Sequence, residues 1–275
     1  MFEINQLGIV TNCWKYELDQ GVPLVACLDQ AVEHGLVAIE LRQTALGDLE
    51  STDRCFPAVE QLAEVTQRYP GLCFDYAMGL SFLSGELSSA DDLVDQACQA
   101  AVAVAGEARP HLRLVDVSTI AAEIRQCEES TVQELVGLVQ RMDQVGGILS
   151  VENCRQPWDD LWRIVQRSRE QLGSLGDQLK ICFDPANFGF VPEAGDSLTA
   201  LSQLRAHDLS MVHLKQIKEA VVLPELVTGE VDWRAHLSEL KRRDYQGPFL
   251  FEMAPGPDCW QRLDAAKLYL QQQLA

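Results

Sequence analysis

The chain has 275 residues, 47% hydrophobic and 23% charged, which is enough apolar material for a sizeable core and too little charge for a disordered chain. Its 22 basic and 41 acidic residues leave a net charge of −19, which argues against nucleic-acid binding because that depends on neutralising phosphates with Lys and Arg. The chain lacks both an apolar run of about 18 residues and a basic start typical of a signal peptide, so we expect a cytoplasmic protein without membrane contact.

Eight short apolar runs alternate with eight longer segments whose apolar residues recur at helical spacing. The predicted strands cover residues 6–11, 36–41, 71–76, 111–117, 147–152, 180–184, 210–215 and 248–252. The predicted helices cover residues 24–34, 56–68, 90–105, 131–144, 158–172, 197–206, 232–243 and 258–273. Eight such units without a linker predict one α/β domain over residues 1–275, a (β/α)8 TIM barrel. A doubly wound open sheet has a similar pattern, but no GxGxxG follows the first strand.

Four polar residues close the last four predicted strands: Glu152, Asp184, His213 and Glu252, at spacings of 32, 29 and 39 residues. The carboxyl ends of barrel strands meet at one rim, where active sites of this architecture lie. Three carboxylates and one imidazole suit an octahedral Mn²⁺, Co²⁺ or Mg²⁺ ion better than a closed zinc site, with Zn²⁺ as the remaining candidate. Three clustered carboxylates without a cation would repel one another strongly, which also favours a metal.

Further residues near these strand ends are candidates for substrate contact. Lys215 lies two residues after the strand-seven histidine and faces the same side, where it can hold a carboxylate, phosphate or enediolate oxygen, or else be a solvated rim lysine. Arg113 lies inside an apolar strand and needs a buried partner, either substrate or a carboxylate such as Glu152. Arg155 is a phosphate candidate, and Trp14 either forms an apolar wall for a sugar face or packs as an ordinary loop residue.

Four short motifs carry a family resemblance: SVEN at 150–153, FDPAN at 183–187, VHLKQ at 212–216 and FLFE at 249–252. Together they resemble the xylose isomerase-like barrel superfamily, and within it the sugar-phosphate isomerase/epimerase branch. The resemblance implies a divalent metal held by Glu152, Asp184, His213 and Glu252. In ketose epimerase relatives, the glutamates at the positions of Glu152 and Glu252 also move protons on opposite faces of the substrate. Homodimers are common in this branch.

The sequence departs from some of these relatives. Asn187, counted here with the substrate-binding residues, stands where many relatives have a histidine. Epimerases of free ketoses have an acidic residue and an arginine where this chain has Trp158 and Glu219. The Asp-Pro-x-Asn and His-Leu-Lys forms are more similar to broadly labelled sugar-phosphate isomerases and to inosose dehydratase-like members.

We therefore expect a metal-dependent isomerase or epimerase of a sugar, a sugar phosphate or a related small hydroxycarbonyl compound. A metal that chelates a carbonyl oxygen and a neighbouring hydroxyl stabilises an enediolate, while Glu152 and Glu252 act as catalytic acid and base. The alternatives are an inosose dehydratase-like lyase and a non-catalytic, metal-free barrel. The DNA-repair endonucleases of the superfamily use three metals and many histidines, whereas this chain has five histidines.

Overall fold

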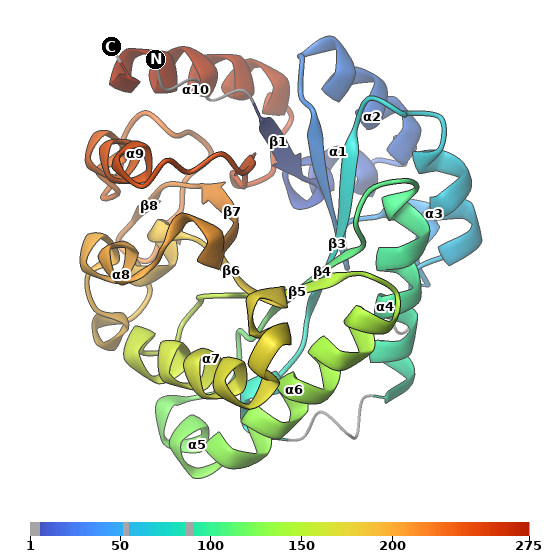
Figure 1. The fold of residues 1–275 in the computed structure, drawn as a ribbon. Coiled ribbons are helices and arrows are strands. Elements are labelled where there is room, and N and C mark those ends of the chain that lie inside the picture. The colour runs from blue at the N-terminus through green and yellow to red at the C-terminus, as the bar shows by residue number, and fades with distance from the viewer. Residues whose placement is uncertain (1–5, 52–54, 86–90, 275) are drawn as a thin grey trace.

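Eight parallel strands close into a barrel in the computed structural model, which describes residues 6–51, 55–85 and 91–274 (Figure 1). Around the barrel the strands follow the order β1-β10-β7-β6-β5-β4-β3-β2. Their bounds are β1 Leu7–Val10, β2 Ala38–Arg42, β3 Cys73–Gly79, β4 His111–Val115, β5 Ile148–Glu152, β6 Leu179–Phe183, β7 Leu209–Leu214 and β10 Phe249–Phe251. The predicted TIM barrel is confirmed.

Helices surround the strands as an outer ring (Figure 1). They are α1 Lys15–Asp19, α2 Leu24–Glu33, α3 Val59–Thr66, α4 Asp91–Ala105, α5 Ala121–Gln126, α6 Glu128–Gln144, α7 Trp158–Leu172, α8 Ser197–Gln203, α9 Trp233–Arg242 and α10 Cys259–Leu274. The short helices α1 and α5 were not predicted, and the predicted helix start at Ala90 lies outside the described residues. Two further short strands, β8 Ile217–Lys218 and β9 Val221–Val222, pair antiparallel after β7.

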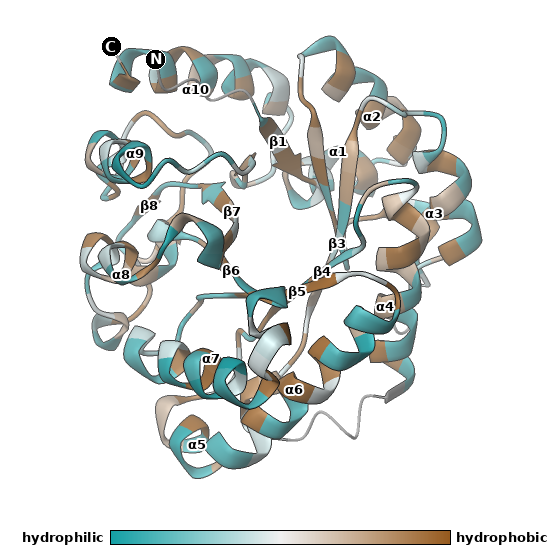
Figure 2. Ribbon diagram, viewed as in Figure 1, coloured by the Kyte–Doolittle hydropathy of each residue, from teal (hydrophilic) through white to brown (hydrophobic). Residues whose placement is uncertain are grey.

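Apolar side chains pack in two layers, because residues of each strand alternate between the barrel interior and the helices. The outer layer, between strands and helices, holds most of the core. Figure 2 shows the matching pattern, with hydrophobic stretches on the strands and hydrophilic stretches on the outer turns of the helices. A small inner cluster fills the barrel itself and consists of Val10, Ala38, Cys182, Met211 and Leu250. Between this apolar cluster and the carboxyl ends of the strands, the barrel interior is polar and charged.

Strand β4 ends at Val115, two residues earlier than predicted, because Asp116 turns the chain. Its carboxylate accepts hydrogen bonds from the backbone N–H groups of Leu83, Ser118 and Thr119 at 2.9, 3.0 and 2.9 Å. Asp116 therefore anchors the loop after β4 at the rim. Within the described residues, no helix has the length and apolar character needed to cross a membrane.

Candidate metal centre

The structure brings Glu152, Asp184, His213 and Glu252 together at the carboxyl ends of β5, β6, β7 and β10. One ligand atom from each lies within 4.8 Å of those of the other three, and all four residues are buried. The strand order places these ends side by side around the rim. The four side chains therefore lie close together, as their positions at the strand ends predicted.

Asp184 owes its orientation to the turn that follows β6. It is the N-cap of the short 3-10 helix η6 (Pro185–Gly189), and its Oδ1 atom accepts backbone hydrogen bonds from Ala186 and Asn187 at 2.9 and 3.3 Å. Pro185 opens this helix, where its missing N–H group costs nothing. The cap uses one carboxylate oxygen and leaves Oδ2 directed into the cluster.

Two asparagines tie the SVEN segment to the DPAN segment. Asn153 bridges to Asp184 twice, since its Nδ2 donates to the backbone carbonyl at 2.7 Å and its Oδ1 accepts from the backbone N–H at 2.9 Å. Asn187 Nδ2 donates to Oε1 of Glu152 at 3.0 Å and to the carbonyl of Asn153 at 2.8 Å. Asn187, predicted to contact substrate, thus orients Glu152 and also lines the cavity described below.

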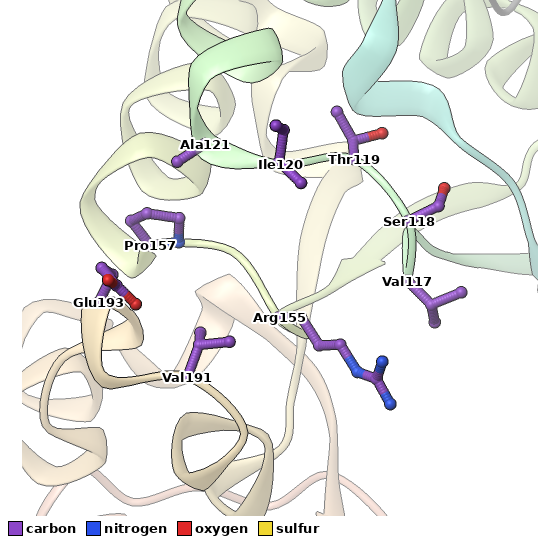
Figure 3. Close-up of a pocket in the computed structure, with 9 residues that line it drawn as sticks. All are labelled: Val117, Ser118, Thr119, Ile120, Ala121, Arg155, Pro157, Val191 and Glu193. Carbon is purple, nitrogen blue, oxygen red and sulfur yellow. The ribbon is translucent and has the colours of Figure 1, made fainter.

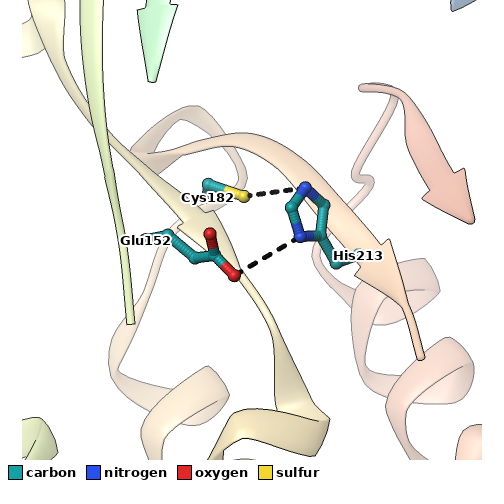
Figure 4. Close-up of side chains that lie close together, drawn as sticks. All are labelled: Glu152, Cys182 and His213. Atoms are coloured by element: carbon teal, nitrogen blue, oxygen red, sulfur yellow. Dashed lines mark hydrogen bonds and ion pairs between the residues drawn. The ribbon is translucent and has the colours of Figure 1, made fainter. Parts of the chain in front are cut away.

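The two ring nitrogens of His213 face different surroundings (Figure 4). Nε2 lies 3.3 Å from Sγ of Cys182 and 3.7 Å from Oε1 of Glu40. Nδ1 faces Glu252 and Glu152 at 3.2 and 3.5 Å, without a hydrogen bond of regular geometry to either. A histidine that binds metal usually donates its other N–H group to a carboxylate or carbonyl. Nδ1 is therefore the nitrogen placed to bind an ion. Burial raises the pKa of Cys182 to about 12, so its thiol stays protonated.

Arg113 joins two carboxylates in the interior and is itself fully buried. Its Nε donates to Oε2 of Glu40 at 3.0 Å, its Nη2 also pairs with Glu40, and its Nη1 lies 2.8 Å from Oε2 of Glu152. Of the two partners that the sequence left open for Arg113, substrate or a carboxylate such as Glu152, the structure shows carboxylates, so Arg113 positions Glu152 rather than contacting substrate. Glu40 was not among the predicted site residues. A carboxylate in the apolar run LVAIEL was the available signal, since a buried charge requires a partner.

Lys215 points inward, as its spacing from His213 predicted, and it is buried. Its Nζ lies 2.5 Å from Oδ2 of Asp184 and donates to Oε2 of Glu252 at 2.7 Å. Glu252 also accepts a hydrogen bond from Nδ2 of Asn12 at 2.9 Å through its Oε1. Lys215 therefore compensates part of the charge of the predicted ligand set.

Charge in this interior is unbalanced. Buried carboxyl groups outnumber buried Arg and Lys side chains, with Glu40, Asp75, Glu152, Asp184 and Glu252 on one side and Arg113 and Lys215 on the other. Burial, followed by the charge of Glu40, raises the pKa of Asp75 well above its usual value, so this carboxyl group retains a proton most readily. Burial would lower the pKa of His213, but the surrounding acidic groups outweigh it and raise the pKa well above its usual value, so the ring is protonated when no ion is bound. With Asp75 protonated, and once an ion displaces the extra proton of His213, an excess of two negative charges remains. One divalent cation has the charge required to balance it, so the donor set fits such an ion.

The three predicted carboxylate ligands differ in pKa. Burial would raise the pKa of Glu152, but Arg113 and His213 outweigh it and lower the pKa below the usual value. Burial is likewise outweighed at Glu252, mainly by Lys215 and His213, which lower its pKa well below the usual value. At Asp184 burial dominates and raises the pKa to about 6. Both glutamates are therefore ionised at neutral pH.

A cavity of about 140 Å³ opens above the cluster. Its lining includes Glu152, Glu252, Lys215 and the predicted phosphate-binding residue Arg155. Trp14, in contrast, is fully buried and packs on Trp260 of α10 with ring centroids 5.7 Å apart, because the 3-10 turn η1 (Thr11–Trp14) directs it into the outer core. The predicted sugar-facing wall at Trp14 is therefore wrong, and the alternative of ordinary packing is correct.

Comparisons with known proteins agree with this architecture. A family model described as "Xylose isomerase-like TIM barrel" matches residues 28–270. A D-allulose 3-epimerase from Methylomonas sp. has 16% identity and a TM-score of 0.72, with 99% of each chain covered. A probable 3-DHS dehydratase, AsbF of Bacillus anthracis, has 16% identity and a TM-score of 0.71, covering 97% of this chain and 98% of that one. The IOLI protein, whose structure contains a zinc atom, has 16% identity and a TM-score of 0.66, covering 98% and 96%. A search among curated proteins finds no match.

Proposed function

This chain belongs to the xylose isomerase-like TIM barrel family, and on that premise we propose that it is a divalent-metal-dependent isomerase or epimerase of a sugar, sugar phosphate or similar hydroxycarbonyl compound. One observation carries the proposal. Glu152 and Glu252 both belong to the four-donor cluster, and both line the same small cavity together with Lys215. Two ionised carboxylates at one cavity can remove a proton from a substrate carbon and return it.

The predicted ligand set is Glu152, Asp184, His213 and Glu252, held by a buried hydrogen-bond network. A bound Mn²⁺, Co²⁺, Mg²⁺ or Zn²⁺ ion would acidify the carbon next to a substrate carbonyl and stabilise the resulting enediolate. A zinc atom in the structurally similar IOLI protein supports a divalent ion in this fold without deciding which ion this chain uses.

Glu152 is the better-positioned base. Arg113 contacts its Oε2 at 2.8 Å and Asn187 donates to its Oε1 at 3.0 Å, which fixes the carboxylate and keeps it ionised. Glu252 is fixed in turn by Asn12 and Lys215. Return of this proton by Glu152 to the neighbouring carbon gives an isomer. Epimerisation needs a second proton, which Glu252 takes up from solvent and delivers to the opposite face of the same carbon, while Glu152 later releases the first proton to solvent.

A dehydratase is the second candidate, and Lys215 is the observation that favours it. Its ammonium group lines the cavity and can donate a proton to a departing β-hydroxyl group after Glu152 has removed the α proton. The products distinguish the two reactions, because dehydration removes water from the substrate whereas isomerisation and epimerisation conserve its composition.

Metal content is the first experiment. Protein purified without chelator should contain a divalent metal at close to one ion per chain by elemental analysis. Protein that contains none, and binds none on addition, would support the non-catalytic barrel instead. Incubation with ketoses and sugar phosphates in D₂O, followed by NMR, should then reveal deuterium at the exchanged carbon for an isomerase or epimerase, or a dehydrated product for a lyase.

Glu152→Gln tests the role of the base. The variant should lose turnover while retaining most of the metal, because the amide oxygen remains a weak ligand but does not accept the proton. Glu170→Gln, a charge-matched change at an exposed residue of α7, serves as the control and should leave activity unchanged. Undiminished turnover in Glu152→Gln would reject the proposed role of Glu152.

A further inference from the structure

Two arginines share the cavity with the catalytic carboxylates. Arg42 ends β2 and Arg155 follows β5, and both line the 140 Å³ cavity that contains Glu152 and Glu252. In the barrel order, β2 and β5 are separated by β3 and β4, so the two arginines approach the cavity from different sides of the mouth. Figure 3 shows the Arg155 side chain extended away from Glu193.

Neither guanidinium forms an ion pair within the described part of the chain. Nη1 of Arg42 donates to neutral acceptors, the carbonyl of Gln43 at 2.8 Å and Oγ1 of Thr44 at 3.2 Å. The Arg155 guanidinium carbon lies 5.0 Å from the ring centroid of Phe190. Acidic residues exceed basic ones by 19 in this protein, and many arginines elsewhere, such as Arg163, are paired with them, although exposed arginines such as Arg68 are not paired among the described residues. Two arginines without an acidic partner at one cavity are therefore available to an anion from outside.

The remaining cation of the cavity is already engaged. Lys215 contacts Asp184 at 2.5 Å and Glu252 at 2.7 Å, so its charge balances the carboxylate cluster rather than a ligand group. The cavity therefore has carboxylates at its base, and at its rim it has guanidinium groups whose charge no carboxylate of the described residues neutralises. Val117 and Phe190 also line it, and apolar walls strengthen the attraction between an arginine and an anion.

The hollows around the cavity also place a second substrate-binding group at the rim. The cavity of about 140 Å³ has room for the reacting carbons beside Glu152 and Glu252, and it opens at its mouth. Two larger hollows of about 450 and 430 Å³ adjoin the cavity, the first sharing Arg155 and the second sharing Arg42 with its lining. A longer substrate must therefore pass an arginine as it leaves the cavity.

On the basis of the proposed function, we infer that the substrate carries a terminal oxyanion, which is either a carboxylate or a phosphate ester. Arg42 and Arg155 bind this oxyanion at the rim of the cavity. The planar fork of a guanidinium group matches both oxyanions with two parallel hydrogen bonds. The reacting carbons then lie at Glu152 and Glu252, and the anion fixes which end of the substrate enters first.

Calorimetric titration of metal-depleted protein with inorganic phosphate and, separately, with acetate tests this inference independently of turnover. At low ionic strength we expect saturable binding of at least one oxyanion, with the tighter of the two identifying the class of the terminal group. Arg42→Ala and Arg155→Ala should each weaken that binding at least tenfold. Arg68→Ala removes the same charge from an exposed position after α3 and should leave it unchanged.

Absence of saturable binding of both probes, or an equal loss in Arg68→Ala, would overturn the oxyanion site. Because the protein is metal-depleted, these results do not depend on proton transfer. The proposed isomerase or epimerase would fail separately, through undiminished turnover of Glu152→Gln or lack of a bound metal. The inference about the substrate terminus and the proposal about the reaction are thus distinguishable.

Discussion

Replacement of Arg113 by methionine should be among the most destabilising single changes in this protein. Methionine fills much of the volume of arginine but leaves Glu40, which is fully buried, without its cation, and it removes one contact of Glu152. Removal of one partner from a buried ion pair typically costs about 3–5 kcal/mol. Glu152 retains Asn187 and His213 as neighbours, so we expect the cost to come mainly from Glu40 and to lie within that range.

Equilibrium unfolding in urea at pH 7, followed by tryptophan fluorescence and circular dichroism, measures this cost. The double variant Glu40→Gln/Arg113→Met should recover part of the lost free energy, because it removes the unpaired charge as well as its partner. Arg113 and His213 hold the pKa of Glu40 well below its usual range, against the effect of burial. Without Arg113 this carboxyl group binds a proton more readily, so the penalty should shrink as the pH falls toward 5. A cost of less than about 1 kcal/mol at pH 7 would refute the assignment of Arg113 as the counter-charge of Glu40.

Three further predictions follow from the same structure. In Gly8→Ala, the new Cβ atom would lie 2.3 Å from the carbonyl oxygen of Ala38. We therefore expect the free energy of unfolding in urea to fall by about 1–3 kcal/mol. A variant as stable as the wild type would contradict the close contact between these strands. Burial lowers the pKa of His111 from 6.5 to about 4, so the unfolded chain binds more protons between these values and stability must fall as the pH drops through this interval. His111→Gln should remove a loss of roughly 3 kcal/mol between pH 6.5 and 4, and identical pH profiles for the two proteins would exclude this origin. Addition of Mn²⁺ at about 100 times its Kd should stabilise metal-depleted protein by about 2.7 kcal/mol, and an equal effect in Asp184→Asn would place the ion elsewhere.

Strand-end residues were predictable from the sequence because adjacent strands of a parallel barrel have a fixed order. Glu152, Asp184, His213 and Glu252 each end an apolar run, and the fold needs only this order to bring them together. The inward direction of Lys215 followed from the period of two in a strand. These features depend on local pattern and topology alone.

Contacts across the barrel could not be predicted in the same way. Glu40 and Arg113 lie on β2 and β4, which are not neighbours, and their pairing depends on side chains that reach through the interior. Trp14 is the last residue of the turn η1, which follows β1 and rotates the side chain into the outer core. The pairing of side chains across the barrel and the direction in which a short turn points a side chain both depend on three-dimensional packing. Hydrophobic periodicity in the sequence does not describe that packing.

The ion pairs of Lys215 with Asp184 and Glu252 have a consequence for the order of events during biosynthesis. Small zinc domains depend on their metal to fold, because nothing else holds their ligands together. In this barrel the closed sheet places the strand ends that carry the proposed ligands side by side, and an ammonium group from the chain itself pairs with two of these ligands. We therefore expect the nascent protein to reach its native fold in a metal-poor cell and to acquire its ion afterwards. The metals available to the finished barrel would then decide which one it carries.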